Sequence, residues 1–238
     1  MKVDLLAFGA HPDDVELACS GTLAKHKSMG KTTGIIDLTR GELGTRGTAE
    51  SRDKEAAAAA KILQVDIREN LAFRDGFFLN DEKHQLEVIK IIRKYRPALV
   101  LTNAPEDRHP DHGKGCKLVT DACFLSGLAK VKTQENGKEQ EAWRPKTVLH
   151  YIQDRYLKPD ILVDISGFFE LRMQSILAYE SQFYNSKSTE AGTYISSPAF
   201  LESLKSRPAE FGRLMGVDYA EGFLFTRLMG VNDLNDLI

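Results

Sequence analysis

Several features that mark whole classes of protein are missing from this chain of 238 residues. Its three cysteines are an odd number without a C-x-x-C pair, which argues against a disulfide framework and indicates free thiols in a reducing compartment. No apolar run approaches the ~20 residues that a membrane-spanning helix needs. The formal net charge is only -2, so the chain has no positive field with which to bind nucleic acid or an anionic membrane.

The beginning of the chain also lacks the pattern of a secretion signal. Residues 1–6 lead directly into an apolar strand, without a charged segment followed by a long apolar one. The expected location is therefore the cytoplasm. We find no internal repeat, low-complexity tract or linker, and the length is sufficient to bury a sizeable core. A single domain over residues 1–238 is predicted.

Short apolar runs alternate with longer segments of helical character in the first half of the chain. Buried strands are predicted at residues 3–9, 33–38 and 98–103. Helices are predicted at residues 15–30, from 49 onward and at 81–95. This alternation is typical of an α/β fold, here a Rossmann-like, doubly wound and mostly parallel sheet with helices on both faces.

The second half of the chain continues this pattern less regularly. Further helices are predicted at residues 113–128, 168–183 and 199–214, and further strands at 147–153, 161–165 and 219–225. Residues 130–141 are polar and charged with one glycine, which predicts an exposed loop or insertion. The sequence leaves open whether this loop contributes to a functional site.

Two polar segments follow predicted strands directly. Ala10-His11-Pro12-Asp13-Asp14 follows the first strand, and the segment from Glu106 to His112 follows the strand that ends at Asn103. Ligand sites of doubly wound sheets lie beyond the carboxyl ends of the strands. Both segments are therefore predicted at the functional edge of the sheet.

The first segment has a structural explanation and a chemical one. Acidic side chains are favoured at the start of a helix, so Asp14 could be an N-cap and His11 a loop histidine. Two adjacent acids with a histidine three positions back exceed what a cap requires. One carboxylate and one imidazole at this spacing can converge on a metal ion, which leaves the second acid free for proton transfer.

The second segment holds two of the six histidines within four residues, flanked by acids. His109 and His112 are three positions apart, so in a helical turn they lie on one face. The alternative to a metal site is a solvated charged loop. Two histidines and one carboxylate leave an open coordination position, which is the pattern of catalytic zinc, although iron(II) suits the same ligands. The residues alone do not tell which of the two histidines binds the ion.

Such a site has the parts needed for metal-assisted hydrolysis of an amide. Water bound to the metal would have its pKa lowered toward ~7, a spare carboxylate can take its proton, and a spare histidine can steady the oxyanion or protonate the leaving amine. A metal-dependent phosphoesterase is an alternative that Arg40, Arg46, Arg52 and Arg108 keep open. A non-catalytic sugar- or nucleotide-binding module is disfavoured, because structural zinc is usually closed by four ligands.

The motifs Ala10-His11-Pro12-Asp13-Asp14 and His109-Pro110-Asp111-His112 resemble those of the PIG-L/LmbE-type N-acetylglucosaminyl deacetylases, with similarity over nearly the whole chain. A narrower resemblance points to the bacillithiol-biosynthesis deacetylases, which act on N-acetylglucosaminyl-malate. It is carried by residues 6–11, 106–112, 178–183 and 219–223. The resemblance implies a zinc-dependent N-acetyl-sugar deacetylase of the EC 3.5.1 type, a hydrolase of linear amides.

The resemblance also implies roles for individual residues. Three of them bind the metal, zinc or iron(II): His11, Asp14 and His112. Asp13 is then the general base, and His109 faces the developing oxyanion and the leaving nitrogen. Asp111, between the two histidines, would orient or tune His109.

Substrate-binding residues are predicted from their chemistry. Arg52 and Arg108 can bind sugar hydroxyls or malate carboxylates, because a guanidinium pairs well with a carboxylate. Alternatively, Arg52 is an exposed helix residue paired with Glu55. Tyr194 lies in a glycine-containing segment that can close over the site, or it is a buried loop aromatic. The Gly41–Gly47 loop has neither a dinucleotide fingerprint nor a Walker lysine, and is expected to line or gate the sugar pocket.

The substrate implied by the resemblance is a small amino-sugar conjugate, N-acetylglucosaminyl-malate. Another N-acetylglucosamine conjugate or a chitooligosaccharide is the alternative. A homo-oligomer is expected, since hexamers are common in the family. Cys19 and Cys116 follow the two motifs, but we interpret them as small buried helix residues rather than metal ligands.

Overall fold

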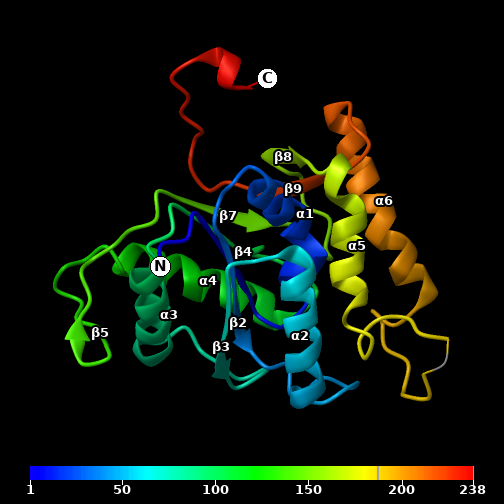
Figure 1. Cartoon of the computed structure of the whole chain (residues 1–238), viewed down its shortest axis with the longest axis horizontal. Coiled ribbons are helices and arrows are strands. Elements are labelled where there is room, and N and C mark those ends of the chain that lie inside the picture. Colours follow the sequence, from blue (N-terminus) through cyan, green and yellow to red (C-terminus); the bar gives the residue numbers. More distant parts are fainter. Residues whose placement is uncertain (187, 238) are drawn as a thin grey trace.

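A seven-stranded sheet runs through the centre of the computed structural model, which describes residues 1–186 and 188–237 (Figure 1). The strands follow the order β3-β2-β1-β4-β7-β9-β8. Their bounds are β1 Leu5–Gly9, β2 Thr33–Thr39, β3 Ile67–Phe73, β4 Leu99–Asn103, β7 Thr147–Tyr151, β8 Ile161–Asp164 and β9 Ala220–Leu224. Neighbouring strands pair in parallel from β3 to β7, whereas β9 is antiparallel to both β7 and β8. The predicted mostly parallel sheet is confirmed.

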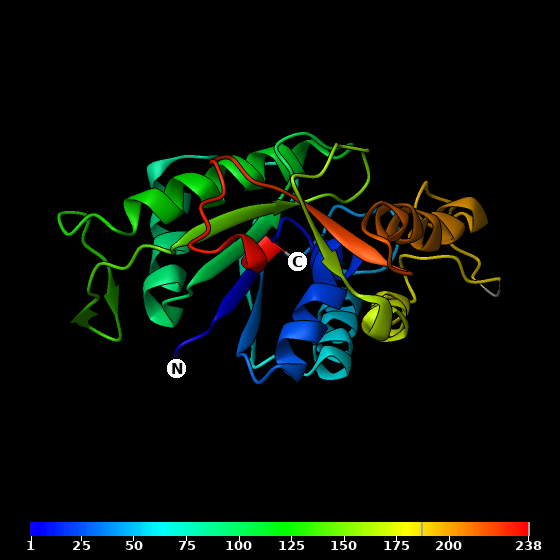
Figure 2. The ribbon, with the colours of Figure 1, turned by 90° about the horizontal axis from the view of Figure 1, so that it is seen from above.

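Helices cover both faces of this sheet, as Figure 2 shows. They are α1 Asp14–Ser28, α2 Ala49–Leu63, α3 Glu82–Tyr95, α4 Pro110–Leu125, α5 Phe169–Leu177 and α6 Pro198–Met215. Side chains of a strand alternate between the two faces. Leu6 and Phe8 of β1 therefore pack with α3 and α4, whereas Leu5 and Ala7 pack with α1 and α5. The two cores confirm the doubly wound arrangement.

The order of the strands reverses between β1 and β4. The chain passes from β1 outward through β2 to β3, and then returns to place β4 on the other side of β1. Loops at the carboxyl ends of β1 and β4 diverge at such a point and leave a crevice between them. The two polar segments begin α1 and α4, directly after these two strands.

Local signals account for most of the helix ends. Thr48 caps α2 by accepting a hydrogen bond from the backbone N–H of Ser51, and the Ser51 side chain accepts one from the N–H of Thr48. Arg96 ends α3 in the left-handed conformation, one residue before Pro97. Helix α4 begins at Pro110, three residues earlier than predicted, because proline is favoured in the first helical turn and His109 provides the cap.

Three segments differ from the prediction. Strand β3 was not foreseen, because its polar residues at the edge of the sheet hide the apolar pattern. Helix α5 ends at Leu177 rather than near residue 183. Residues 130–141 contain a small antiparallel hairpin of β5 Gln134–Glu135 and β6 Lys138–Glu139, turned by Asn136-Gly137 at positive φ.

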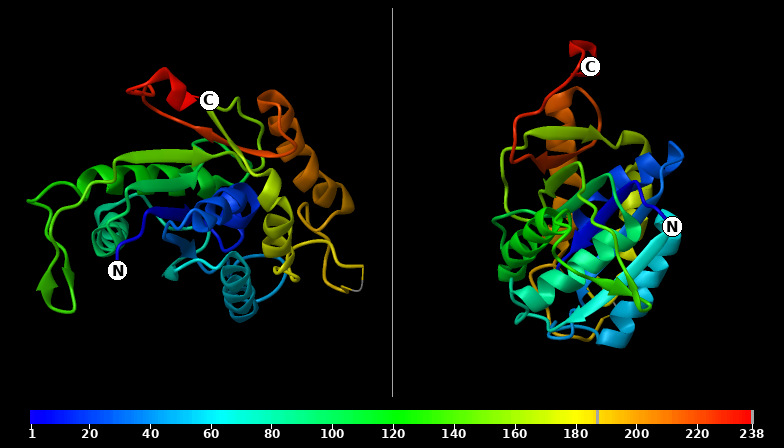
Figure 3. Two further views of the ribbon diagram at one scale, coloured as in Figure 1. Left: turned by 45° about the horizontal axis from the view of Figure 1, so that its top comes forward. Right: turned by 90° about the vertical axis from the view of Figure 1, so that its left-hand side faces the viewer.

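The remaining parts lie at the outside of the molecule. The β5–β6 hairpin packs beside α3 and contributes no residue to the crevice in the part of the chain that the structure describes. After β9 the chain ends in a short 3-10 helix, η2 Leu234–Leu237, which stands clear of the helical layers (Figure 3). Among the described residues, none of the helices has the length and apolar character required to cross a membrane.

Candidate active site

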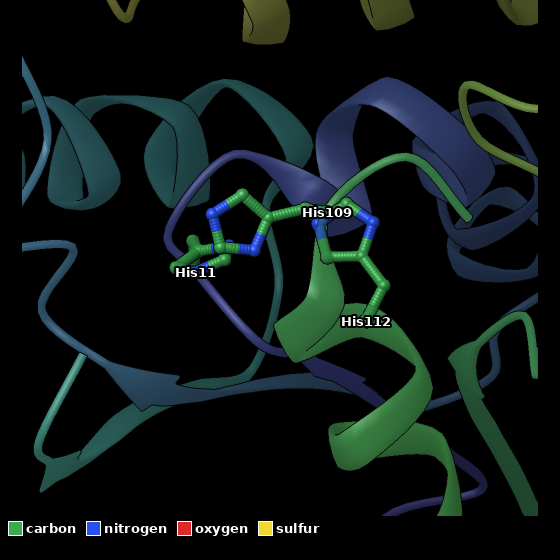
Figure 4. A group of neighbouring side chains, drawn as sticks. All are labelled: His11, His109 and His112. Carbon is green, nitrogen blue, oxygen red and sulfur yellow. The ribbon is translucent and has the colours of Figure 1, made fainter. Parts of the chain in front are cut away.

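Three histidines from the two loops meet in the crevice between β1 and β4. His11 comes from the β1–α1 loop, whereas His109 and His112 lie at the start of α4. Figure 4 shows their imidazole rings close together. The ring centroids of His11 and His109 are 4.5 Å apart, and those of His11 and His112 are 5.6 Å apart. One ring nitrogen of each lies within 4.8 Å of the other two. The predicted meeting of two distant loops is therefore present.

Asp14 lies between His11 and His112. Its Oδ2 is 3.6 Å from His11 Nδ1 and its Oδ1 is 3.1 Å from His112 Nε2. The amides of Asn103 and Gln153 donate hydrogen bonds to the two oxygens, at 3.1 Å and 2.9 Å. Burial would raise the pKa of this carboxyl, but His112 and His11 hold it well below its usual value. Asp14 is thus a charged, oriented carboxylate.

His112 is oriented from its far side. Its Nδ1 is 2.7 Å from Asp107 Oδ2, while Nε2 faces Asp14. Burial lowers the pKa of His112, but Asp14 and Asp107 outweigh it and raise the pKa to about 9. A carboxylate on the second ring nitrogen is the usual support for a histidine that binds metal.

These residues fit a divalent ion. His11, Asp14 and His112 offer two imidazole nitrogens and one carboxylate, which is the donor set of a catalytic zinc site with one position open. His109 also lies within reach, but Asp14 contacts His112 rather than His109. His11, His109 and His112 also have donor atoms within 4.8 Å of one another, so the set that the resemblance implied stays a prediction.

Asp13 occupies an unusual backbone conformation at the N-cap of α1. Its φ of 121° is rare for any residue except glycine, and its side chain makes no capping hydrogen bond. The buried carboxylate lies 3.3 Å from Arg52 Nη2. Burial raises the pKa of Asp13 to about 7, against the opposing effect of Arg52. The interpretation of Asp14 as a simple N-cap is wrong, because Asp13 holds that position and does not cap.

Arg52 is buried beside Asp13 in the first turns of α2. It is 4% exposed, and its Nη2 donates a hydrogen bond to the carbonyl oxygen of Pro12. The alternative of an exposed arginine paired with Glu55 is wrong, since Glu55 accepts hydrogen bonds from Ser181 instead. Arg52 lines the pocket, but its direct contacts hold the Asp13 loop.

His109 is held as a hydrogen-bond donor to the pocket. The backbone N–H of Asp111 donates to Nδ1 of His109 at 3.2 Å, so Nδ1 carries no proton and Nε2 carries one. Burial and the neighbouring His11 lower the pKa of His109 to about 4. A neutral imidazole with its N–H on Nε2 can donate to an oxyanion.

The Asp111 side chain turns toward His11 instead of His109. Its Oδ2 lies 3.4 Å from His11 Nε2 and accepts a hydrogen bond from the backbone N–H of Gly76 at 2.8 Å, while Oδ1 pairs with Lys114 at 2.6 Å. Asp111 was predicted to orient His109, but only its backbone N–H contacts His109, which any residue at this position would provide. Its carboxylate acts on His11.

The pocket around the histidines is lined by residues of several loops. Gly41, Leu43, Gly44, Thr45 and Arg46 form one wall, as expected for the glycine-rich loop. No residue of the 130–141 segment lines it, among those that the structure describes.

Arg108 and Tyr194 also line this pocket and lie next to each other. Arg108 Nε donates to Asp154 Oδ2 at 2.8 Å, the Tyr194 hydroxyl is 3.1 Å from Asp154 Oδ1, and the guanidinium carbon is 4.7 Å from the centre of the tyrosine ring. Tyr194 is 56% exposed, so the alternative of a buried aromatic is wrong. The two predicted substrate residues share one carboxylate, Asp154, which was not foreseen.

Sequence reasoning did not single out several other residues that contact the candidate site residues. They are single polar residues near the carboxyl ends of strands: Asp75, Asn103, Asp107 and Gln153. Their position relative to the strands was a usable signal, and Asp75 escaped because β3 itself was not predicted. Cys19 and Cys116 are buried and belong to no group that could share an ion among the described residues, in agreement with the interpretation as core residues.

Comparison with known proteins shows similarity over most of the chain. The PIG-L family model, described as GlcNAc-PI de-N-acetylase, matches residues 6–123 and so includes both motifs. The diacetylchitobiose deacetylase of Thermococcus kodakarensis is 27% identical over 231 residues, which are 93% of this chain and 82% of that protein.

Two solved structures extend the similarity. The conserved protein TT1542 from Thermus thermophilus is 38% identical with a TM-score of 0.85, and the match covers 97% of this chain and 98% of that one. The N,N'-diacetylchitobiose deacetylase from Pyrococcus horikoshii is 25% identical with a TM-score of 0.79, covering 99% of this chain and 88% of that one. The chain is therefore similar along nearly its whole length to deacetylases of N-acetylated sugars.

Proposed function

Because the chain belongs to the PIG-L family, we propose that it is a metal-dependent hydrolase that removes the acetyl group from an N-acetylglucosamine conjugate. One observation carries this proposal: His11, Asp14 and His112 meet at the carboxyl edge of the sheet, with the carboxylate of Asp13 beside them. The similarity to two diacetylchitobiose deacetylases supports the same class of substrate.

The metal that we propose is zinc, although iron(II) suits the same donors. His11, Asp14 and His112 would hold it. A divalent ion bound there polarises the acetyl carbonyl and lowers the pKa of water.

Asp13 and His109 would carry out the proton transfers and charge stabilisation. As the water oxygen bonds to the carbonyl carbon, Asp13 accepts the proton of that water. His109 donates a hydrogen bond from Nε2 to the carbonyl oxygen as negative charge develops on it. When the C–N bond breaks, Asp13 returns the proton to the leaving nitrogen, which yields acetate and a free amine. Arg52 keeps the Asp13 loop in place.

For the group attached to the sugar we propose malate. Arg108, which lines the pocket, contacts Asp154 through Nε, and its side chain is 45% exposed. Its other N–H groups can therefore bind a ligand carboxylate. A chitooligosaccharide is the second candidate, favoured by the similarity to the two diacetylchitobiose deacetylases.

The cellular location and the oligomeric state are also proposals. The three buried free cysteines support a reducing compartment, the cytoplasm. The family resemblance supports a homo-oligomer, with a hexamer as the form to test first.

Acetate release tests the reaction class directly. The substrates are N-acetylglucosaminyl-malate, N,N'-diacetylchitobiose, a methyl N-acetylglucosaminide and p-nitrophenyl phosphate. We expect acetate from at least one sugar conjugate, loss of this activity after chelation, and recovery with added zinc or iron(II). Phosphate release without acetate release would instead establish a phosphoesterase.

The proposed malate contact has its own test. Arg108→Met should raise KM for the malate conjugate by about 10-fold or more, because a hydrogen-bonded charge pair contributes roughly 1.5–3 kcal/mol. KM for the methyl glycoside should not change. Arg155→Met, an exposed neighbour, is the matched control. An equal rise for both substrates would contradict malate recognition by Arg108.

A further inference from the structure

We propose that Asp75 is a positioning residue for His11, whose Nε2 it holds so that Nδ1 is the nitrogen presented to the metal. The proposal rests on the proposed function, because it takes His11 as a metal ligand. None of the sequence motifs contains Asp75, which lies in the loop between β3 and α3.

The two nitrogens of His11 face different partners. Nε2 lies 3.1 Å from Asp75 Oδ1 and 3.4 Å from Asp111 Oδ2, whereas Nδ1 faces Asp14 Oδ2 at 3.6 Å. A carboxylate can only accept a hydrogen bond, so Nε2 must keep its proton between Asp75 and Asp111. Nδ1 is therefore the nitrogen left to face the metal site, beside the predicted ligand Asp14.

Asp75 is the better acceptor of the two carboxylates around Nε2. It is the nearer one, and Oδ1 of Asp111 is already paired with the ammonium group of Lys114 at 2.6 Å. Among the residues that the structure describes, the Oδ2 atom of Asp75 accepts a hydrogen bond from one neutral group, the backbone N–H of Leu43, at 3.0 Å. Both carboxylates are buried, which strengthens a hydrogen bond to either of them, so the shorter distance and the free charge of Asp75 decide between the two.

The same carboxylate connects His11 to the wall of the pocket. Besides the bond from Leu43, the backbone N–H of Asp75 donates to Glu42 Oε1 at 2.9 Å. Leu43 belongs to the glycine-rich loop that lines the pocket. Removing the Asp75 side chain should therefore affect metal binding through His11 and substrate binding through this loop.

A second metal ion is the competing explanation for this group. His11, Asp75 and Asp111 each offer a donor atom within 4.8 Å of the other two. The ammonium group of Lys114 already supplies positive charge to Asp111, which disfavours another cation there. The metal content of the protein distinguishes the two explanations: one equivalent supports the hydrogen bond, and two equivalents overturn it.

The main experiment measures zinc affinity by competition with a chromophoric chelator for the full chain and for Asp75→Ala and Asp75→Asn. Loss of a carboxylate that hydrogen-bonds to a metal ligand typically lowers metal affinity by 10–100-fold. We therefore expect the zinc affinity of Asp75→Ala to fall by this factor. Asparagine still accepts a hydrogen bond, and Asp75→Asn should recover part of the affinity. The absorption spectrum of the cobalt(II)-substituted protein should also change in Asp75→Ala, because the orientation of a ligand has changed.

A matched control removes a carboxylate from an ion pair elsewhere. Asp121 on α4 pairs with the exposed Lys117 and touches none of the three histidines. Asp121→Ala should leave zinc affinity and the cobalt spectrum unchanged. Circular dichroism checks that each variant is folded, and if Asp75→Ala does not fold, the comparison is made with Asp75→Asn.

The outcomes separate this inference from the proposed function. Unchanged zinc affinity in folded Asp75 variants, with loss of zinc in His11→Ala, overturns the role of Asp75 alone. A 10–100-fold loss of affinity in a protein that deacetylates no N-acetylglucosamine conjugate supports Asp75 and overturns the function.

Discussion

Asp13 has two energetically unfavourable features, one in its backbone and one in its side chain. Its φ of 121° is strained for a side chain with a Cβ, and its carboxylate is buried with one arginine beside it. Both costs are characteristic of functional positions, because folding alone favours relaxed backbone and solvated charge. These two features distinguish Asp13 from Asp14, although the sequence alone makes the two adjacent acids equally good candidates for the site.

Substitutions at these positions should separate metal binding from turnover. We expect Asp13→Asn to keep its metal and lose turnover by about 100-fold or more, because the amide cannot accept the proton of the water. His11→Ala should lose both metal and turnover. Metal analysis and acetate release measure the two effects. Normal metal content in His11→Ala would remove the ligand assignment.

The cysteines provide a further test at this scale. Cys116 is a buried residue of α4, and its Sγ lies 3.3 Å from His150 Nδ1. Cys116→Ala and Cys19→Ala should retain the metal content of the wild type, although each can lose some stability through the cavity left behind. A loss of metal from either folded variant would show that a thiolate takes part in the site.

Among the secondary-structure elements, β3 shows why apolar runs do not predict every edge strand. Arg68 in this strand binds Asp37 of β2 at 2.8 Å and 2.9 Å, Glu16 of α1 at 2.5 Å, and the hydroxyl of Tyr179 at 2.8 Å. The polar residue is thus satisfied by tertiary partners. A local sequence pattern could not predict these contacts, because the partners lie 31 to 111 positions from Arg68 in the chain.

Removing this arginine should be costly for stability. Arg68→Met leaves the buried carboxylates of Asp37 and Glu16 without their cation, which typically costs about 3–5 kcal/mol. Urea unfolding at pH 7 measures the effect. The double variant Arg68→Met, Asp37→Asn should recover part of the loss. A change below about 1 kcal/mol in the single variant would contradict a structural role for the network.

The cap of α2 is a smaller contribution of local sequence. Thr48→Ala removes the hydroxyl that accepts from Ser51 N–H, and we expect the free energy of unfolding to fall by about 1 kcal/mol. Thr48→Ser keeps the hydroxyl and is the matched control. Equal stability of the alanine and serine variants in urea would show that the capping bond contributes nothing.

At the scale of the whole molecule, acid should lower the free energy of unfolding, because a carboxylate next to the amino end of β1 loses its charge. Hydrogen bonds from the backbone N–H and the hydroxyl of Thr32 hold the pKa of Asp4 below its ordinary value. A lowered pKa in the folded state contributes stability above the ordinary pKa of about 4, and this stability is lost as the pH falls further. We therefore expect urea midpoints to fall from pH 5 to pH 2.

Asp4→Asn isolates this effect. The variant should be less stable than the wild type by about 1 kcal/mol at pH 7, and the difference should disappear near pH 2, where the wild-type carboxyl is protonated. A difference between the two proteins that is independent of pH would contradict the assignment. Asp53→Asn, on the exposed face of α2, serves as the control.

The sequence by itself determined the alternation of strands and helices, the edge at which the two motifs lie, and the chemical types that meet there. Apolar runs, caps and stop signals act over a few residues, and the parallel βαβ rule then places all strand ends on one side. For this reason His11, Asp13, Asp14, His109 and His112 could be selected without a structure.

Only the tertiary structure decided how these residues are held. Most partners of the site come from distant segments: Asp75 on His11, Arg52 on Asp13, and Asp154 between Arg108 and Tyr194, whereas Asp107 lies in the same loop as His112. A side chain contact across the sheet depends on packing of distant segments and has no period or spacing in the chain. The sequence therefore names the chemical groups, whereas the fold selects which nitrogen or oxygen of each group faces the reaction.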